Sequence, residues 1–102
     1  MLLLKPNCEV CDRDLPPESP HARICSYECT FCVDCVEGIL NNVCPNCGGG
    51  FVPRPIRPVG EHRSGVSRSH QLPSDKRVNT KYSREELAAF SDTLAGTPPA
   101  ER

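Results

Sequence analysis

Cysteine is the residue type whose number and spacing indicate chemistry in this sequence. All eight cysteines lie between Cys8 and Cys47, in pairs separated by two or three residues, and the second half of the chain has none. A two-residue spacer lets one turn of backbone present both sulfurs to a single tetrahedral ion, and zinc accepts four thiolates at about 2.3 Å. Eight cysteines fill two such sites with none left over, so we expect two structural Zn²⁺ ions as cofactors.

The cellular compartment decides between metal ligands and disulfides. The apolar run at residues 1–4 is shorter than the roughly 7–15 apolar residues of a signal-peptide core. No stretch approaches the ~18 apolar residues that span a membrane. We therefore expect a cytoplasmic protein without membrane association. Clustered cysteines in that reducing compartment are metal ligands or redox groups rather than disulfides.

Two other uses of the thiols agree less well with the spacing. The run Cys29-x2-Cys32-x2-Cys35 followed by Cys44 resembles a ferredoxin iron–sulfur motif, but eight residues separate its last two cysteines, where the motif has about three. Four other cysteines would also have no role. Thioredoxin-like chemistry needs a βαβ pattern that is missing here. Zinc storage or sensing is less favoured because buried, zinc-bound thiolates are structural by default.

The order in which the cysteines pair is open at this stage. Sequential pairing would join the first four cysteines in one site and the last four in another. Only two residues separate Cys29 from Cys32, which leaves little chain to hold two independent sites apart. This crowding favours interleaved sites that share one core.

The cysteine order resembles the cross-brace of RING-type zinc domains. The segments CEVC, CTFC, CVEGIL and CPNC, all within residues 8–47, match that pattern, with Cys29 where a histidine is usual. The resemblance implies a small zinc-stabilised α+β fold of the treble-clef or cross-brace kind, with a short β-hairpin and one helix. It also implies alternate pairing of the ligands. Zinc 1 would be bound by Cys8, Cys11, Cys32 and Cys35, and zinc 2 by Cys25, Cys29, Cys44 and Cys47.

Over residues 1–58 the chain is similar to a family of small bacterial cysteine-rich proteins catalogued as a domain of unknown function, family 1272. The similarity rests on the segment KPNCEVCDRDLPPESPHARICSYECTFCVDC and on the CPNCGG and RPIRP segments that follow it. It implies a bacterial cytoplasmic protein but brings no activity with it.

Local signals place the secondary structure around the cysteines. Residues 22–26 and 29–32 predict the two strands of the hairpin. A helix is expected to open at Asp34 or the next residue and to end near Asn42. Together these elements form a two-zinc domain over residues 1–52.

The second half of the chain predicts a largely disordered tail. Residues 53–82 predict a basic, mobile linker, because this stretch is rich in Pro, Arg and Ser and has few large apolar side chains to bury. Residues 83–96 predict a short amphipathic helix, in which Ser83 and Glu86 form a capping box. Residues 97–102 are expected to be disordered. The apolar stripe of the helix consists of Leu87, Phe90 and Leu94.

These features predict a zinc-binding module for protein interaction rather than an enzyme. A catalytic zinc keeps one position open for water, whereas both sites here would be full. The RING resemblance implies a partner-binding surface formed by Val10, Leu40 and Pro45. Ubiquitin-ligase activity is not expected, because Gly48 stands where a basic residue often follows the last ligand and bacteria of this sort generally lack the ubiquitin cascade.

The charge distribution supports an alternative function, nucleic-acid binding or a regulatory accessory role. Residues 1–50 carry a net charge of −4, and residues 51–102 a net charge of +3. Between Arg54 and Arg84 eight basic residues accompany two acidic ones, and such an arm can follow a phosphate backbone. Tyr82 is its single aromatic residue for base stacking. The arm can equally fold back on the acidic half, so we favour a protein partner.

Overall fold

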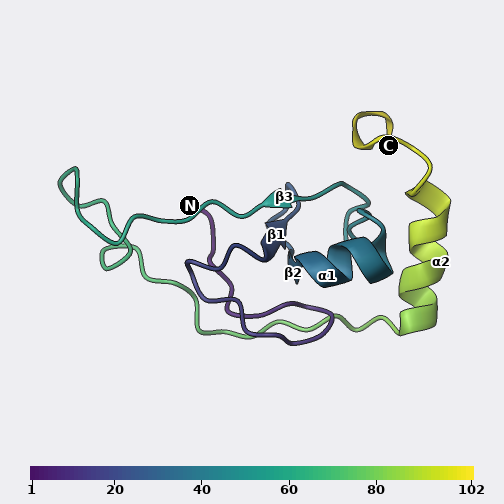
Figure 1. Cartoon of the computed structure of the whole chain (residues 1–102), viewed down its shortest axis with the longest axis horizontal. Helices are drawn as coiled ribbons and strands as arrows, with labels where there is room; N and C mark the ends of the chain where they lie inside the picture. The colour runs from purple at the N-terminus through teal and green to yellow at the C-terminus, as the bar shows by residue number, and fades with distance from the viewer.

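A small antiparallel sheet forms the centre of the molecule, for which the computed structural model describes residues 1–102 (Figure 1). β1 (Ala22–Ile24) and β2 (Thr30–Cys32) form the predicted hairpin. β3 (Val52–Pro53) pairs with the other edge of β1 and completes the strand order β2-β1-β3. Phe31 of β2 is fully buried and meets Phe51 edge to face, with ring centroids 5.3 Å apart. The aromatic pair fixes the chain before β3 against the hairpin.

The predicted helix follows β2 directly and is present in a widened form. α1 (Val33–Cys35) continues into a single π-helical turn, η1 (Val36–Leu40). The first and last residues of η1 are buried. Asn41 and Asn42 end the helix in the left-handed region, with φ of 49° and 59°, which asparagine tolerates better than most residues. The helix therefore ends where the sequence predicts.

Thiols make up half of the hydrophobic core. A cluster of 12 buried residues joins the sheet to the helical segment, and six of its members are cysteines. The six apolar side chains that complete the cluster are those of Leu15, Ala22, Phe31, Val36, Leu40 and Leu87. So few apolar groups provide limited hydrophobic stabilisation. Bonds from the thiols to a metal ion would supply further stabilisation.

Arg54 anchors the beginning of the tail inside the folded body. Its side chain is only 4% exposed, and its guanidinium donates to the carbonyl oxygens of Lys5 (2.8 Å), Leu15 (3.2 Å) and Pro16 (3.0 Å). Arg57 likewise donates to the carbonyl oxygen of Leu2 at 2.6 Å. These hydrogen bonds fix the chain after β3 against the N-terminal residues.

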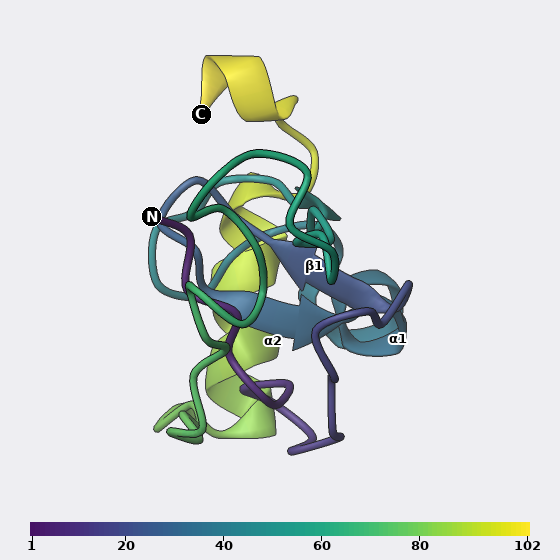
Figure 2. The same ribbon diagram turned by 90° about the vertical axis from the view of Figure 1, so that its left-hand side faces the viewer.

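The segment that follows the loop of residues 59–72, called the distal loop, lies beside the first cysteine pair (Figure 2). The amide of Asn7 donates to the carbonyl oxygen of Val78 at 2.9 Å, and the backbone N–H of Val78 donates back to the Asn7 side chain at 3.2 Å. Arg77 forms ion pairs with Asp12 (3.0 Å) and Asp14 (2.8 Å). The predicted mobile linker over residues 53–82 is therefore not confirmed. Polar side chains, rather than apolar burial, hold it in place.

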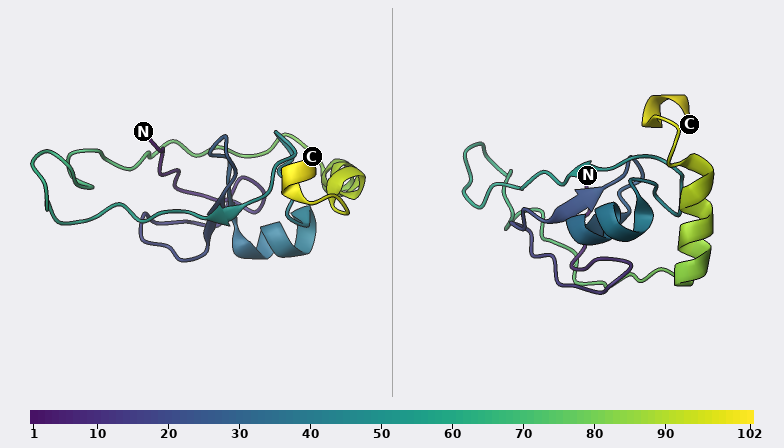
Figure 3. Two further views of the ribbon diagram at one scale, coloured as in Figure 1. Left: turned by 90° about the horizontal axis from the view of Figure 1, so that it is seen from above. Right: turned by 45° about the vertical axis from the view of Figure 1, so that its right-hand side comes forward.

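α2 (Arg84–Leu94) is the predicted amphipathic helix. Ser83 is its N-cap, and the capping box is complete, because the Ser83 hydroxyl accepts from the Glu86 N–H and the Glu86 carboxylate accepts from the Ser83 N–H. α2 packs across the end of η1 at one extremity of the molecule, opposite the loop of residues 59–72 (Figure 3). An 11-residue helix is marginal alone in water, so this packing stabilises it.

The buried face of α2 differs from the predicted stripe. Leu87 and Ser91 are its buried residues, whereas Phe90 is 39% exposed. The Ser91 hydroxyl donates to the Leu40 carbonyl oxygen at 2.9 Å and accepts from the Asn41 amide at 3.1 Å. The end of η1 offers polar groups that need partners, and serine satisfies them where phenylalanine would not.

The last residues, predicted to be disordered, also make defined contacts. η2 (Pro99–Glu101) is a single 3₁₀ turn. Arg102 donates to the carbonyl oxygens of Asn42 (2.8 Å) and Gly48 (3.0 Å), and Pro99 lies against Gly50. The whole molecule measures 46 × 27 × 18 Å, and it contains no helix with the length and apolar character of a membrane span.

Arg54→Ala tests whether the tail is an integral part of the fold. We expect the free energy of unfolding to fall by about 2–3 kcal/mol, because the Leu15 and Pro16 carbonyl groups lose a charged donor. Urea denaturation of the purified protein measures the change. Arg63→Ala, at an exposed arginine of the distal loop, is the matched control and should behave as wild type. Equal stability of the two variants would contradict the anchoring role of Arg54.

Candidate metal centre

The first thiol group contains four cysteines from two parts of the chain. The Sγ atoms of Cys8, Cys11, Cys32 and Cys35 all lie within 4.8 Å of one another. The Cys11 and Cys32 sulfurs are 3.8 Å apart. Four sulfurs arranged tetrahedrally at ~2.3 Å from zinc are separated by about 3.8 Å. The group therefore has the dimensions of a four-thiolate metal site.

Two kinds of backbone turn present these sulfurs. The Cys8–Cys11 pair lies on a tight knuckle, in which the N–H of Asp12 donates to the Cys8 carbonyl oxygen at 2.9 Å and Asp12 has a φ of 63°. Cys32 ends β2 and serves as the N-cap of α1. Cys35 lies in the first turn of that helix. A knuckle and a helix N-terminus thus face each other across the group.

The second thiol group contains three cysteines within the same limit and a fourth at its edge. The sulfurs of Cys25, Cys44 and Cys47 lie within 4.8 Å of one another. Cys29 is not in this set, but it is buried and its thiol faces Cys25 and Cys44. The Cys25–Cys29 pair occupies the turn of the β1–β2 hairpin. Metal binding in this group would require Cys29 to close in on the other three.

The Cys44–Cys47 knuckle repeats the geometry of the first one. The N–H of Gly48 donates to the Cys44 carbonyl oxygen at 2.7 Å, and Gly48 has a φ of 81°. A Cβ atom on Gly48 would come within 2.9 Å of the Leu94 side chain of α2. Backbone N–H groups also donate to sulfur, from Tyr27 to Cys25 at 3.3 Å and from Gly49 to Cys47 at 3.4 Å.

The two groups alternate along the chain. The first combines the Cys8–Cys11 pair with the pair that ends β2 and enters α1, and the second combines Cys25 of the hairpin turn with the last pair. The structure thus brings the predicted ligand residues together in the interleaved order, with Cys29 at the edge of its set. Sequential pairing would need Cys8 and Cys25 in one group, and they lie in different groups.

Crowding and burial make both groups unfavourable for negative charge unless a cation is present. Burial and the neighbouring Cys8 and Cys32 groups raise the pKa of the Cys35 thiol. Burial raises the pKa of Cys44 in the same way. The pKa of Cys32 is lowered although burial acts to raise it, because the Cys35 N–H and neighbouring thiols donate to its sulfur. A divalent ion bound to each group would supply the positive charge that stabilises its cysteines as thiolates.

Neither group includes a histidine or a carboxylate. His70, for example, hydrogen bonds to Ser67 at 2.7 Å and lies 3.3 Å from the Glu61 carboxylate in the distal loop. Four-thiolate sets form closed structural sites, whereas catalytic zinc sites have three protein ligands and a water. The first group, and the second with Cys29 as its fourth ligand, therefore fit a structural ion.

Two residues within the knuckles were missed by the sequence interpretation. Glu9 follows Cys8 and is only 4% exposed, and Asn46 precedes Cys47. The amide of Asn46 donates to the Glu9 carboxylate at 3.4 Å. Their positions inside C-x2-C pairs were a usable signal, but nothing in the sequence alone shows that Glu9 is buried.

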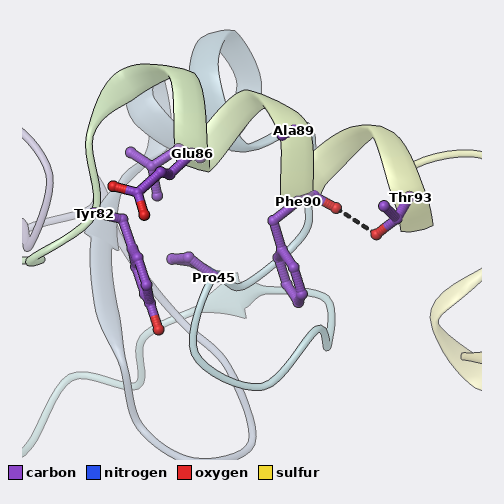
Figure 4. A pocket seen from close by; sticks show the side chains of 7 residues that line it. Pro45, Tyr82, Glu86, Ala89, Phe90 and Thr93 are labelled. Carbon is purple, nitrogen blue, oxygen red and sulfur yellow. Dashed lines mark hydrogen bonds between the residues drawn. The ribbon is translucent and has the colours of Figure 1, made fainter.

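The implied partner surface is largely covered. Leu40 and Pro45 are buried and Val10 is half-buried, and α2 packs over this face of the molecule. Pro45 nevertheless forms the floor of a groove of about 460 Å³ between the side chains of Tyr82 and Phe90 (Figure 4). The remaining lining residues belong to α2 and are Glu86, Leu87, Ala89 and Thr93.

In the basic arm, residues 54–84, half of the basic side chains form hydrogen bonds or ion pairs with other parts of the molecule. Arg54 and Arg57 donate to backbone carbonyl groups, Arg68 pairs with Glu18 at 3.2 Å, and Arg77 pairs with two aspartates. The other four basic residues between Arg54 and Arg84 are exposed, and these are Arg63, Lys76, Lys81 and Arg84.

Comparison with known proteins finds similarity over the first half of the chain. A 59-residue stretch, 58% of this chain, is 64% identical to an uncharacterised protein of Rhizobium meliloti (strain 1021) and covers 70% of that protein. No solved structure matches the chain. The family model described as "Protein of unknown function (DUF1272)" matches residues 1–57. That match spans more than half of the chain, and the chain therefore belongs to the DUF1272 family.

Proposed function

We propose that this protein is a structural two-zinc module that binds a protein partner. The observation that carries the proposal is the pair of interleaved, all-cysteine groups, one of four sulfurs and one of three with Cys29 beside it. All-cysteine sets favour zinc among the common divalent ions and leave no position for a substrate. The ions then hold the hairpin, the helical segment and both knuckles in one body.

The groove over Pro45 is the proposed partner site. Its walls are the Tyr82 and Phe90 rings, and the Glu86 carboxylate lies at its rim (Figure 4). Leu87 also lines the groove. One Glu86 oxygen caps α2, which leaves the other for a ligand. With eight thiolates and two zinc ions, residues 1–50 have a net charge of −8. We therefore expect a peptide segment with one large apolar side chain beside a basic residue.

The contacts of the arm give the nucleic-acid alternative less support. Four of its eight basic side chains already have partners within the molecule, and ion pairs with Asp12, Asp14 and Glu18 reduce the positive field of the arm. The arm thus serves to join the tail to the acidic zinc domain. The covered positions of Leu40 and Pro45 and the glycine at position 48 argue against a ligase-type activity.

Metal removal provides the first test. Native mass spectrometry of protein purified without added metal is expected to give two zinc ions per chain. Because each structural zinc contributes roughly 10–16 kcal/mol, the chelated protein should lose its cooperative thermal transition in circular dichroism, and two equivalents of Zn²⁺ should restore it. An unchanged sharp transition after chelation would refute the structural role of the metal.

Cys32→Ser tests the interleaved arrangement. The variant is expected to lose one zinc ion and to keep the other, because serine is a poor zinc ligand. Alkylation followed by mass spectrometry should show Cys8, Cys11 and Cys35 as reactive, while the cysteines of the second group stay protected. Reactivity of Cys44 and Cys47 together with protection of Cys8 and Cys11 would indicate sequential pairing instead.

Phe90→Ala tests the groove. A phage-displayed peptide library selected on the zinc-loaded protein should yield sequences with an apolar residue beside a basic one. Their affinity for Phe90→Ala is expected to fall at least about tenfold, the loss typical of a central apolar contact. Val59→Ala, at an exposed residue outside the groove, is the control and should bind as wild type. Peptides that bind both variants equally, or no enriched peptide at all, would exclude the groove.

A further inference from the structure

Glu9 is a buried carboxylate to which the two metal groups assign no ligand role. One carboxylate oxygen accepts from the Thr30 N–H at 2.8 Å and lies 3.5 Å from the Lys5 ammonium group. The other accepts from the Asn46 amide at 3.4 Å. A carboxylate this deeply buried is tolerated only when it is paired and hydrogen bonded. Its three donors meet that condition.

These contacts join the two metal groups. Glu9 directly follows Cys8 of the first group, while Thr30 directly follows Cys29, and Asn46 lies inside the last knuckle of the second group. The Glu9 N–H also donates to the Thr30 carbonyl oxygen at 3.0 Å. One side chain of the first knuckle thus holds both segments that supply the sulfurs of the second group.

The contacts of Glu9 also bear on Cys29, the thiol that lies farthest from the rest of its group. Cys29 is the one sulfur outside the 4.8 Å limit of its group. The Asn46 amide, whose position is fixed by Glu9, also faces the Cys29 thiol. Since the first group already has all four sulfurs together, an ion there would fix the Cys8–Cys11 knuckle and, through Glu9, hold Asn46 and the backbone after Cys29 in place.

We propose that Glu9 is a positioning residue that couples the two metal sites, so that zinc bound by Cys8, Cys11, Cys32 and Cys35 promotes binding at the second site. This inference rests on the proposed two-zinc function. It predicts a property beyond that function, namely cooperative filling of the sites in a fixed order.

Glu9→Gln separates coupling from simple stabilisation. Glutamine keeps the size of the side chain and an acceptor for the Thr30 N–H, but it loses the charge beside Lys5 and presents an NH2 group instead of an acceptor oxygen to the Asn46 amide. One equivalent of Zn²⁺ is added to the reduced, metal-free protein, and native mass spectrometry counts the species. If zinc in the first group raises the affinity of the second group about tenfold above that of the first, the one-zinc species of the wild type stays below about a quarter, whereas independent sites give about half or more.

The expected result is a scarce one-zinc species in the wild type and an abundant one in Glu9→Gln. Alkylation of that species should find the first group protected and Cys25, Cys29, Cys44 and Cys47 reactive. Glu18→Gln removes an exposed carboxylate outside the network and should reproduce the wild type. A Glu9 that only stabilises the fold would weaken both ions together and leave the one-zinc species scarce in Glu9→Gln, which would overturn the proposal.

Asn46→Ala keeps the inference testable if Glu9→Gln does not fold. The Asn46 side chain is largely exposed, and its removal breaks the same link from the other end, so the same one-zinc species should accumulate. A wild-type distribution in Asn46→Ala, an abundant one-zinc species in the wild type, or the same rise in Glu18→Gln would each overturn the coupling. A chain that never binds two zinc ions refutes the proposed function itself, whereas two ions with unaltered coupling refute only the role of Glu9.

Discussion

The charge of crowded, buried thiols is the constraint on which this structure depends. Six of the twelve residues in the main core cluster are cysteines, and burial raises the pKa of Cys35 and Cys44. Without a cation these groups form a weak core of protonated thiols. With one they become ligands whose bonds replace the apolar contacts that a short chain cannot supply. The fold of this chain therefore depends on the spacing of its cysteines more than on its number of apolar side chains.

Interleaving distributes that stabilisation over the first half of the chain. The first group joins the Cys8–Cys11 pair to the pair that ends β2 and enters α1, and the second joins the hairpin turn to the last knuckle. Both groups use cysteines of the hairpin or of α1, so an ion in either group would tie the sheet and the helical turn to the knuckles. A sequential arrangement would have produced two small units that meet only at the Cys29–Cys32 segment.

Signals from residues close in sequence predicted the centre of this fold, but they did not predict how the second half of the chain packs on it. The hairpin, the helix that ends at the two asparagines, and the Ser83 capping box all depend on residues close in sequence. The docked tail depends on Arg54, whose partners Lys5 and Leu15 are remote carbonyl groups, and composition carries no trace of such hydrogen bonds. The same holds for Ser91, which satisfies the end of η1 and displaces Phe90 from the buried face.

The proposed groove depends on the metal through the two elements that form it, α2 and the Cys44–Cys47 knuckle. One wall of the groove belongs to α2, and its floor belongs to the Cys44–Cys47 knuckle. α2 is too short to be stable alone, and it packs on Leu40 and against Gly48, both of which the thiol groups hold in position. Loss of an ion would release the knuckle, the end of η1 and then the helix. A partner that recognises the groove would therefore bind only the metal-loaded protein.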